Sequence, residues 1–277
     1  MSKVYRTRIA PTTSGLLHIG HASTFKCACE RAKKFGGSVV LRIDDIDFER
    51  CKKEYLDAAI EDMQSCGIEW DEGYLVGGKF GPYLQSQRLA TYESVMLKLI
   101  SCGAIYPSPH SRAEIARIAR YSSSKNNLYE PELIFPTEFR TETTSTDIAN
   151  FKNLNWRFRI PDGELIDFFD NHFGHICFEA SVDFGDFLVW RKNGTPSYEL
   201  ASAIDDACMQ ITEIVRGADL LLSTARQILI WRTLGSKIPE FYHCPLLRGD
   251  NGEKLSKTSM QKSGENRWLI RTNRENI

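Results

Sequence analysis

Residues 4–21 of the chain read VYRTRIAPTTSGLLHIGH, which predicts a strand, a turn and the start of a helix. Its first part, residues 4–10, predicts a short apolar strand, and a turn of Thr, Ser and Gly follows. A helix is expected from about His18 to Phe35, where two glycines end it. The N-terminus of a helix has unpaired N–H groups and the positive end of the helix dipole, so it attracts phosphate. His18 and His21 share one face of the first helical turn.

Strand-like and helix-like segments alternate before and after a less regular middle region. We expect further strands at residues 39–43, 211–215 and 243–247, and further helices at residues 49–66, 87–102, 198–204 and 223–234. Ser223 is the predicted cap of the last helix. The middle region predicts short strands at residues 156–160, 176–180 and 187–191. This order predicts an α/β fold, a Rossmann-like parallel sheet with helices on both faces, split by an α+β insertion.

The composition is that of an ordinary globular protein. Hydrophobic residues make up 42% and charged residues 26% of the chain, which argues against a disordered or coiled-coil protein. The formal net charge of -1 neither requires nor excludes a nucleic acid partner. No run of about 18 apolar residues occurs, the N-terminus has no signal region, and the eight cysteines are scattered. We therefore expect a cytoplasmic protein with free thiols and no membrane segment.

A second group of functional residue types lies near the other end, where residues 248–258 read RGDNGEKLSKT. This loop follows a strand and contains two lysines and two hydroxyl groups. Such a loop can close over a phosphate and stabilise the negative charge that develops there in a transition state. Taken alone, this loop could equally be a solvated surface turn. His18 and His21 could equally be capping residues. Gly20 between them allows a ligand to approach the backbone closely.

Together the two stretches resemble class I aminoacyl-tRNA synthetases. The sequence HIGH at residues 18–21 matches the first signature of that class, and KLSKT at residues 254–258 is a close variant of the second. Further features are similar to the glutamyl branch, and these are residues 8–11, 41–47, 197–201, 213–220 and 223–227. The resemblance covers about residues 5–103 and 184–260. It implies a catalytic domain that joins glutamate to tRNA.

The resemblance implies an amino-acid site. Arg8 would pair with the glutamate side-chain carboxylate through its planar guanidinium, and Thr12 would add a hydroxyl contact. Asp44 would face the substrate α-amino group, at a position where the family usually has the longer Glu. Tyr198 and Arg216 would complete the pocket. The full predicted set is Arg8, Ile9, Ala10, Pro11, Thr12, Asp44, Tyr198 and Arg216.

The resemblance also implies an ATP site, with Mg²⁺ accompanying the nucleotide. His18 and His21 would hold the phosphates, and Lys257 would stabilise the charge that develops as the adenylate forms. The reaction is an in-line attack of the substrate carboxylate on the α-phosphate, which needs no protein nucleophile. The predicted catalytic residues are His18, His21 and Lys257, and the predicted ATP-binding residues are His18, Gly20, His21, Lys254, Ser256 and Lys257.

The predicted domains are a first catalytic half at residues 1–103, an acceptor-binding-like insertion at residues 104–183 and a second catalytic half at residues 184–277. Because only residues 259–277 follow the lysine loop, we expect no anticodon-binding domain. In this the chain resembles the glutamyl-Q tRNA(Asp) synthetase family, which attaches glutamate to the queuosine of tRNA(Asp). The expected partners are L-glutamate, ATP and tRNA, with tRNA(Asp) favoured, and the expected state is a monomer. The resemblance implies that glutamate is activated without tRNA.

Two departures from that family keep alternatives open. The family usually holds zinc in the insertion through cysteines, but no cysteine lies between Cys102 and Cys177. Structural zinc needs four ligands in a tetrahedral arrangement, and His110 and Tyr129 do not supply them. We therefore predict no structural zinc and no other metal site. The intact His21, which the family often varies, favours a glutamate–tRNA ligase without its anticodon domain. A non-catalytic paralogue is a further alternative, and Asp44 also permits activation of another small acid.

Overall fold

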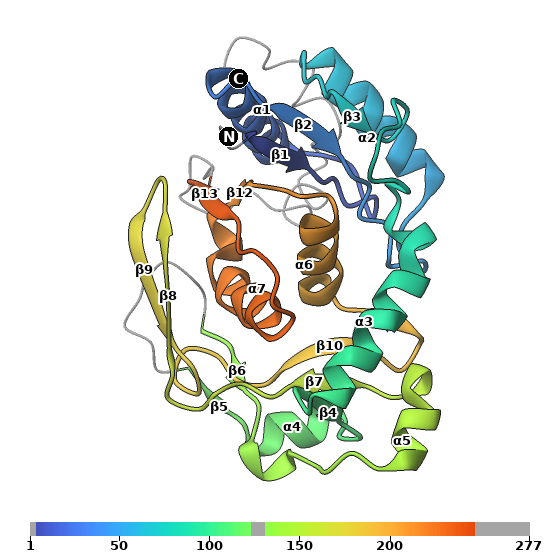
Figure 1. Ribbon diagram of the computed structural model, residues 1–277, viewed down its shortest axis with the longest axis vertical. Coiled ribbons are helices and arrows are strands. Elements are labelled where there is room, and N and C mark those ends of the chain that lie inside the picture. The colour runs from blue at the N-terminus through green and yellow to red at the C-terminus, as the bar shows by residue number, and fades with distance from the viewer. Residues whose placement is uncertain (1–3, 123–130, 247–277) are drawn as a thin grey trace. The chain divides into compact units, whose positions relative to one another are not determined.

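The structure is a computed structural model that describes residues 4–122 and 131–246 (Figure 1). Internal contacts divide the chain into two compact units. Unit 1 comprises the described parts of Met1–Arg88, Met209–Ala218 and Pro239–Ile277, and unit 2 comprises those of Leu89–Cys208 and Asp219–Ile238. Unit 2 is larger than the predicted insertion, because it also contains residues 89–103, 184–208 and 219–238. The three predicted domains stay a prediction.

Unit 1 is built on parallel strands. Its elements are β1 (Arg6–Ile9), α1 (Ile19–Lys34), β2 (Ser38–Leu41), α2 (Lys53–Ser65), β3 (Glu72–Gly73), the 3₁₀ turn Gln85–Arg88, β12 (Glu213–Gly217) and β13 (Glu240–Cys244). The pairs β1–β2, β2–β3 and β12–β13 are all parallel. β12 lies beside β1, where the Thr212 backbone N–H donates to the Arg6 carbonyl at 2.8 Å. The carboxyl ends of these strands therefore meet at one edge.

One hydrophobic core holds α1 and α2 against unit 1's sheet. Ile9 of β1 and Leu41 of β2 are register partners, and both are buried in this core. α1 contributes residues three to four apart, which is the spacing that places them on one helix face, and these are Ala22, Phe25, Ala28 and Ala32. α2 contributes Ala59 and Met63 in the same way. Small side chains on α1 let the helix lie close to the strands (Figure 1).

Unit 2 contains an antiparallel sheet in the order β11-β10-β7-β4 and a long β8–β9 hairpin (Figure 1). Its helices are α3 (Leu89–Ser101), α4 (Arg112–Ile118), α5 (Ser145–Ala149), α6 (Tyr198–Cys208) and α7 (Leu221–Thr233), with 3₁₀ turns at Thr137–Phe139, Phe151–Asn153 and Ala218–Leu220 at its margin. Its strands are β4 (Ile105–Pro107), β5 (Arg120–Tyr121), β6 (Leu133–Ile134), β7 (Trp156–Phe158), β8 (Leu165–Asp170), β9 (Gly174–Glu179), β10 (Phe187–Arg191) and β11 (Thr195–Pro196).

A buried carboxylate joins the segments of the insertion. Asp186 accepts from the Tyr106 hydroxyl at 2.6 Å, from Arg140 Nε at 2.7 Å and from the Ile160 backbone N–H at 2.9 Å. Burial, reinforced by the Asp186 charge, raises the pKa of Tyr106 well above its ordinary value. Hydrogen bonds to Asp186 and Asp162 raise the pKa of Arg140. Because all of these groups are satisfied, the ion pair is compatible with burial.

The predicted Rossmann-like α/β fold, with a parallel sheet and an antiparallel insertion, is confirmed. Several details differ, and two of them have a clear physical reason. Ser223 does not cap α7, because the helix begins at Leu221 and the Ser223 hydroxyl donates to Glu199 at 2.9 Å. The strand predicted at residues 243–247 ends at Cys244, since Pro245 has no N–H to continue the ladder.

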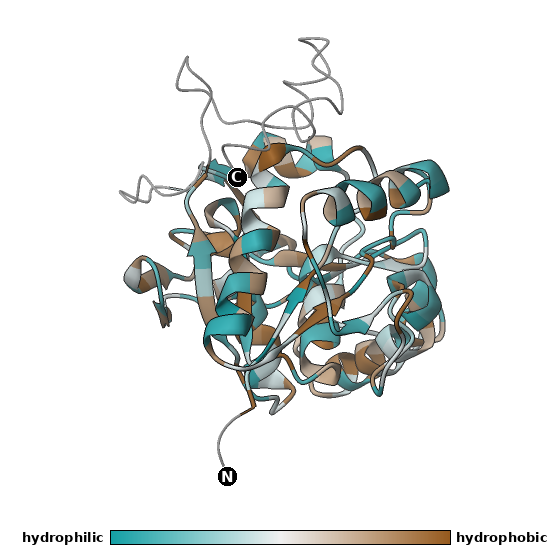
Figure 2. Ribbon diagram, turned by 90° about the horizontal axis from the view of Figure 1, so that it is seen from above, coloured by the Kyte–Doolittle hydropathy of each residue, from teal (hydrophilic) through white to brown (hydrophobic). Residues whose placement is uncertain are grey.

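The helices carry both hydrophilic and hydrophobic residues along their length, as amphipathic helices do (Figure 2). Among residues 4–122 and 131–246, no helix has the combination of length and hydropathy needed to cross a membrane.

An ion pair in unit 1, with a buried carboxylate and a half-buried guanidinium, gives a stability prediction. Glu213 of β12 is 1% exposed and accepts from Arg31 Nε at 2.7 Å, Arg31 Nη2 at 2.6 Å and the Tyr5 hydroxyl at 2.5 Å. Glu213→Ala leaves the Arg31 guanidinium without its counter-charge, so we expect the free energy of unfolding to fall by about 3–5 kcal/mol. Urea denaturation followed by circular dichroism measures this change.

The matched control for this prediction is Asp57→Ala, which breaks the exposed ion pair of Asp57 with Lys53 on α2. An exposed pair contributes little, so we expect a change of under about 1 kcal/mol. Equal losses in Glu213→Ala and Asp57→Ala would contradict the stabilising role given to the buried pair.

Candidate active site

The N-terminus of α1 is capped by its own two histidines. His18 is the cap residue, with extended backbone angles, and its Nδ1 accepts from the Gly20 backbone N–H at 3.1 Å. In return, His21 Nδ1 accepts from the His18 backbone N–H at 3.2 Å. This is the reciprocal arrangement of a capping box, made here by two imidazoles instead of Ser and Glu. The two rings lie 3.8 Å apart between centroids, tilted by 45°.

These caps determine where each imidazole carries its proton. A ring nitrogen that accepts a hydrogen bond has no proton, so a neutral ring carries it on the other nitrogen. His18 and His21 both accept through Nδ1, which places both protons on Nε2. Nε2–H is a donor that suits a phosphate oxygen. The two interpretations of these histidines, capping and phosphate binding, therefore use different nitrogens and are compatible.

Gly20 is required by the position of the His18 ring. A Cβ atom at residue 20 would lie 2.9 Å from His18 Cε1 and 3.0 Å from Nδ1. The first distance is shorter than carbon atoms tolerate, so any other residue would displace the capping imidazole. The glycine between the histidines thus serves the cap, in addition to leaving space above the backbone.

The predicted amino-acid residues of β1 occupy different environments. Arg8 is 4% exposed, and its Nη1 donates to the Val215 carbonyl of β12 at 3.0 Å. Ile9 packs in the core, so it can contact a ligand only through its backbone. The Pro11 carbonyl accepts the Asp44 backbone N–H at 3.0 Å, and Thr12 is exposed. Ala10 is partly exposed. The loop after β1 is thus bonded to the residues that follow β2.

Asp44 is held by a buried arginine that sequence reasoning missed. Arg42 Nε donates to Asp44 Oδ1 at 2.7 Å and Nη2 donates to Oδ2 at 3.3 Å. Arg42 is fully buried and Asp44 is 5% exposed. Since a buried guanidinium requires a counter-charge, this pairing favours the ionised carboxylate. The sequence contained a signal for this pair, because Arg42 lies within the apolar run 39–43. A strand covered on both faces tolerates a charged side chain only when that side chain has a partner.

Arg216, at the carboxyl end of β12, is bonded to a residue that was not predicted from the sequence. Its Nε donates to Nε2 of His243 on β13 at 3.1 Å, and both residues are buried. Arg8, Asp44 and Arg216 thus lie near the carboxyl ends of parallel strands in unit 1, where ligands bind in open α/β sheets. Two guanidinium groups and one carboxylate complement a substrate with two carboxylates and one ammonium group.

The position of the remaining predicted site residues relative to this edge stays a prediction. Tyr198 is the first residue of α6 in unit 2, so its place beside Arg8 and Arg216 stays a prediction. The loop residues Lys254, Ser256 and Lys257 lie outside the described residues.

The insertion does not present a zinc site in its described part. Within residues 4–122 and 131–246, no group of three or more His, Cys, Asp or Glu side chains converges in a way that would hold a metal. His110 instead stacks on Phe139, with ring centroids 3.9 Å apart and an angle of 7°. Ser108 accepts from Arg157 Nε at 3.3 Å, and Tyr129 lies outside the described residues. The described residues at this place do not fit a zinc site. The absence of structural zinc stays a prediction.

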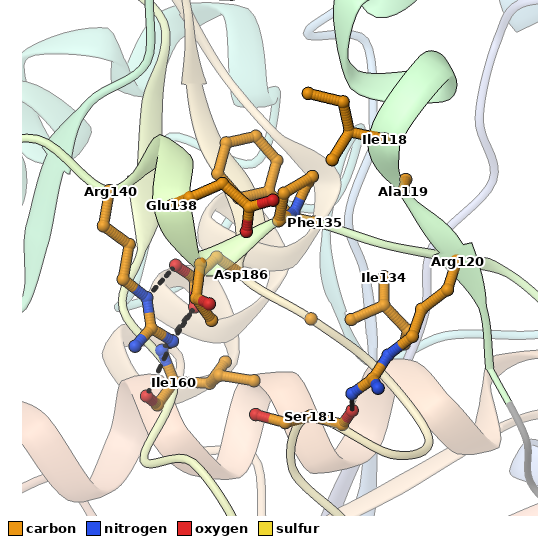
Figure 3. Close-up of a pocket in the computed structure, with 13 residues that line it drawn as sticks. Ile118, Ala119, Arg120, Ile134, Phe135, Glu138, Arg140, Ile160, Ser181 and Asp186 are labelled. Carbon is orange, nitrogen blue, oxygen red and sulfur yellow. Dashed lines mark hydrogen bonds and ion pairs between the residues drawn. The ribbon is translucent and has the colours of Figure 1, made fainter.

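The insertion also contains a cavity of about 290 Å³ (Figure 3). Phe135 and Ile118 form apolar parts of its wall, and Glu138 also lines it. Arg140, bonded to Asp186, closes one side. On the other side, Arg120 Nη2 donates to the Ser181 carbonyl at 3.0 Å. The cavity therefore combines an apolar wall with charged edges.

Comparison with known proteins defines the class. Residues 4–274 match the family described as tRNA synthetases class I (E and Q), catalytic domain. The chain belongs to this family, and a domain of this class uses ATP. The family resemblance predicted from the sequence is confirmed.

Among similar curated proteins is the glutamyl-Q tRNA(Asp) synthetase of Symbiobacterium thermophilum, 41% identical over 90% of this chain and 77% of that protein. The same enzyme of Nitratidesulfovibrio vulgaris is 36% identical over 91% of this chain and 77% of its own length. The glutamate–tRNA ligase of a Sulfurihydrogenibium species is 37% identical over 91% of this chain but only 52% of the ligase. The chain thus spans about half the length of the ligase it matches.

A solved structure agrees with this assignment. The glutamate–tRNA synthetase of Elizabethkingia anophelis superimposes with a TM-score of 0.78 at 27% identity. The match covers 95% of this chain and 54% of that one, so this chain also spans about half of the synthetase.

The His18 cap generates a prediction for nucleotide use. Gly20→Ala displaces the His18 ring, so we expect the KM for ATP to rise about 10-fold or more in ATP–pyrophosphate exchange. Loss of the cap destabilises the helix, but the higher helix propensity of alanine offsets part of this, so the free energy of unfolding should fall by less than about 1 kcal/mol. Ser23→Ala, in the same helix, should leave the KM for ATP unchanged. An unaltered KM in a folded Gly20→Ala variant would contradict the link between the cap and the phosphates.

Proposed function

We propose that this chain activates L-glutamate with ATP, in the presence of Mg²⁺, and transfers the glutamyl group to tRNA, at the queuosine of tRNA(Asp). The observation that carries the proposal is the match to two glutamyl-Q tRNA(Asp) synthetases over 90% or more of this chain and 77% of their length. The predicted monomeric state and cytoplasmic location belong to the same proposal.

The buried charges of unit 1 support glutamate as the acid. Arg8 and Arg216 offer guanidinium groups, and Asp44 offers a carboxylate, from positions that the backbone and neighbouring side chains hold in place. The Arg8 fork suits the side-chain carboxylate, and Asp44 suits the α-ammonium group. Asp44 keeps the charge of the family's usual Glu, and its bonds to Arg42 hold the shorter side chain in one orientation.

The proposed reaction has two transfers. In the first, an oxygen of the glutamate α-carboxylate attacks the α-phosphorus of ATP, and the bond from that phosphorus to the bridging oxygen of pyrophosphate breaks. In the second, a hydroxyl of the RNA attacks the carbonyl carbon of the adenylate, loses its proton and releases AMP. Positioning and charge stabilisation drive both transfers, since no protein nucleophile is needed. His18 and His21 would donate Nε2–H to phosphate oxygens, and Lys257 would stabilise the developing charge.

ATP–pyrophosphate exchange with each of the twenty amino acids, first without tRNA and then with it, tests the proposal. We expect exchange with glutamate alone, because the predicted pocket is complete without RNA. We then expect labelled glutamate to be transferred to tRNA(Asp) that contains queuosine, and not to tRNA(Asp) that lacks it.

The other outcomes separate the alternatives. Exchange that requires tRNA, followed by charging of a tRNA 3′ end, would indicate a glutamate–tRNA ligase instead. Exchange with a different acid would point to the shorter Asp44 side chain as a change in specificity. A folded protein with no exchange under any condition would contradict the proposed enzyme and leave a binding paralogue.

We propose further that the insertion contacts the RNA through a surface formed by α4 and β5, here called the α4 face. Its residues are Arg112, Arg117, Ile118, Arg120 and Tyr121, and all five are exposed. Among the described residues, neither Arg112 nor Arg117 forms an ion pair, so both can meet phosphates. Ile118 and Arg120 also line the cavity of the insertion, which has room for an unstacked base.

The double variant Arg112→Gln/Arg117→Gln tests the α4 face. Removing two phosphate contacts should weaken tRNA binding about 10-fold and reduce the slope of log K against log salt by about 2. Amino-acid activation without RNA should not change. Fluorescence anisotropy with labelled tRNA measures both quantities.

The matched control is Lys98→Gln/Lys192→Gln, which removes two exposed positive charges elsewhere in unit 2. If this control weakens tRNA binding as much as the arginine variant does, the attraction is nonspecific and the α4 face is not the contact.

A further inference from the structure

Arg216 and His243 are register partners on the neighbouring parallel strands β12 and β13. The bond between them runs from Arg216 Nε to His243 Nε2 and is 3.1 Å long. His243 has no exposed surface, and Arg216 is 4% exposed. Two rigid strands therefore hold both side chains, and the hydrogen bond adds a fixed orientation for the guanidinium plane.

The chemistry of this bond specifies the state of the imidazole. A guanidinium group is always protonated and has only donors, so the acceptor must be a nitrogen with a free lone pair. His243 is therefore neutral, with its proton on Nδ1. This is the opposite tautomer to the one that the caps impose on His18 and His21. An arginine next to a charged imidazole would instead meet a second positive charge in a buried place.

We propose that His243 is a positioning residue for the amino-acid substrate. By accepting from Nε, it sets the plane of the Arg216 fork and directs the two Nη groups toward a substrate carboxylate. The inference rests on the proposed function, because it assigns Arg216 to the glutamate site. It adds a residue that touches no substrate itself and acts through the arginine.

Two substitutions separate the hydrogen bond from the volume of the side chain. His243→Gln keeps an acceptor oxygen near the position of Nε2, whereas His243→Leu fills similar space without an acceptor. We expect the KM for glutamate in ATP–pyrophosphate exchange to rise about 10-fold or more in His243→Leu, because the fork loses its fixed direction. His243→Gln should recover most of that loss. The KM for ATP should stay within about twofold in both.

Controls distinguish positioning from a general packing defect. Glu240→Gln, exposed at the opposite end of β13, should leave both KM values unchanged. In an Arg216→Lys background, which lacks Nε, adding His243→Leu should raise the KM for glutamate no further. If folded His243→Leu keeps the wild-type KM for glutamate, or loses ATP and glutamate affinity equally, the proposal is overturned. Should the leucine variant fail to fold, His243→Asn, whose acceptor lies near Nδ1 instead, takes its place with the same expected loss.

A second readout is independent of catalysis. Nitrogen-15 spectra of the wild-type imidazoles report which ring nitrogen is protonated, and we expect His243 to be neutral with its proton on Nδ1. If the wild type shows no exchange but has this spectrum, the proposed function fails while the Arg216–His243 bond stands. If His243 carries its proton on Nε2, the positioning role fails whatever the activity.

Discussion

The capped first turn of α1 is the interaction on which the rest of unit 1 depends. α1 packs across β1, β2 and β12, and its direction is set where the chain leaves β1 and enters the helix. Both His18 and His21 use Nδ1 to close that turn. With Nδ1 accepting in each ring, Nε2 is the nitrogen that carries the proton of a neutral imidazole. The two histidines cap the helix, and the phosphate binding proposed for them would use the other ring nitrogen, while Gly20 leaves the space that the His18 ring requires.

Buried charge is the second constraint, and backbone and side-chain acceptors satisfy it. Arg8 donates to the Val215 carbonyl, Arg42 to Asp44 and Arg216 to His243. Each bond satisfies a donor of a buried guanidinium group, and in the Arg42–Asp44 pair the acceptor also supplies the counter-charge. The same bonds restrict the rotamers of the charged groups. A site assembled in this way needs little reordering when a small polar ligand arrives, because its donors and acceptors already point in fixed directions.

The local part of this architecture could be predicted from the sequence, whereas the pairings could not. The helix at Ile19–Lys34 and the strand at Phe187–Arg191 follow from periodicity and turn residues within their own segments. The partner of Arg216 depends on the register between strands that start 27 residues apart, which no local pattern encodes. Ser223 has the ideal chemistry for a cap, but tertiary contact with Glu199 uses its hydroxyl instead. Tyr198 and the lysine loop remain predictions.

The helix α4 of the insertion can change its sequence more freely than the core can. α4 has a complete capping box made by Ser111 and Glu114, yet none of its residues is buried. Its stability is therefore local, and its outward side chains contribute almost nothing to the core. Outside the capping residue Glu114, substitutions along Arg112–Ile118 should be nearly neutral for folding, so this helix can diverge in charge and size while the fold persists. Under the proposal that the α4 face contacts the RNA, selection or an engineer can alter RNA recognition at this helix while the fold is kept.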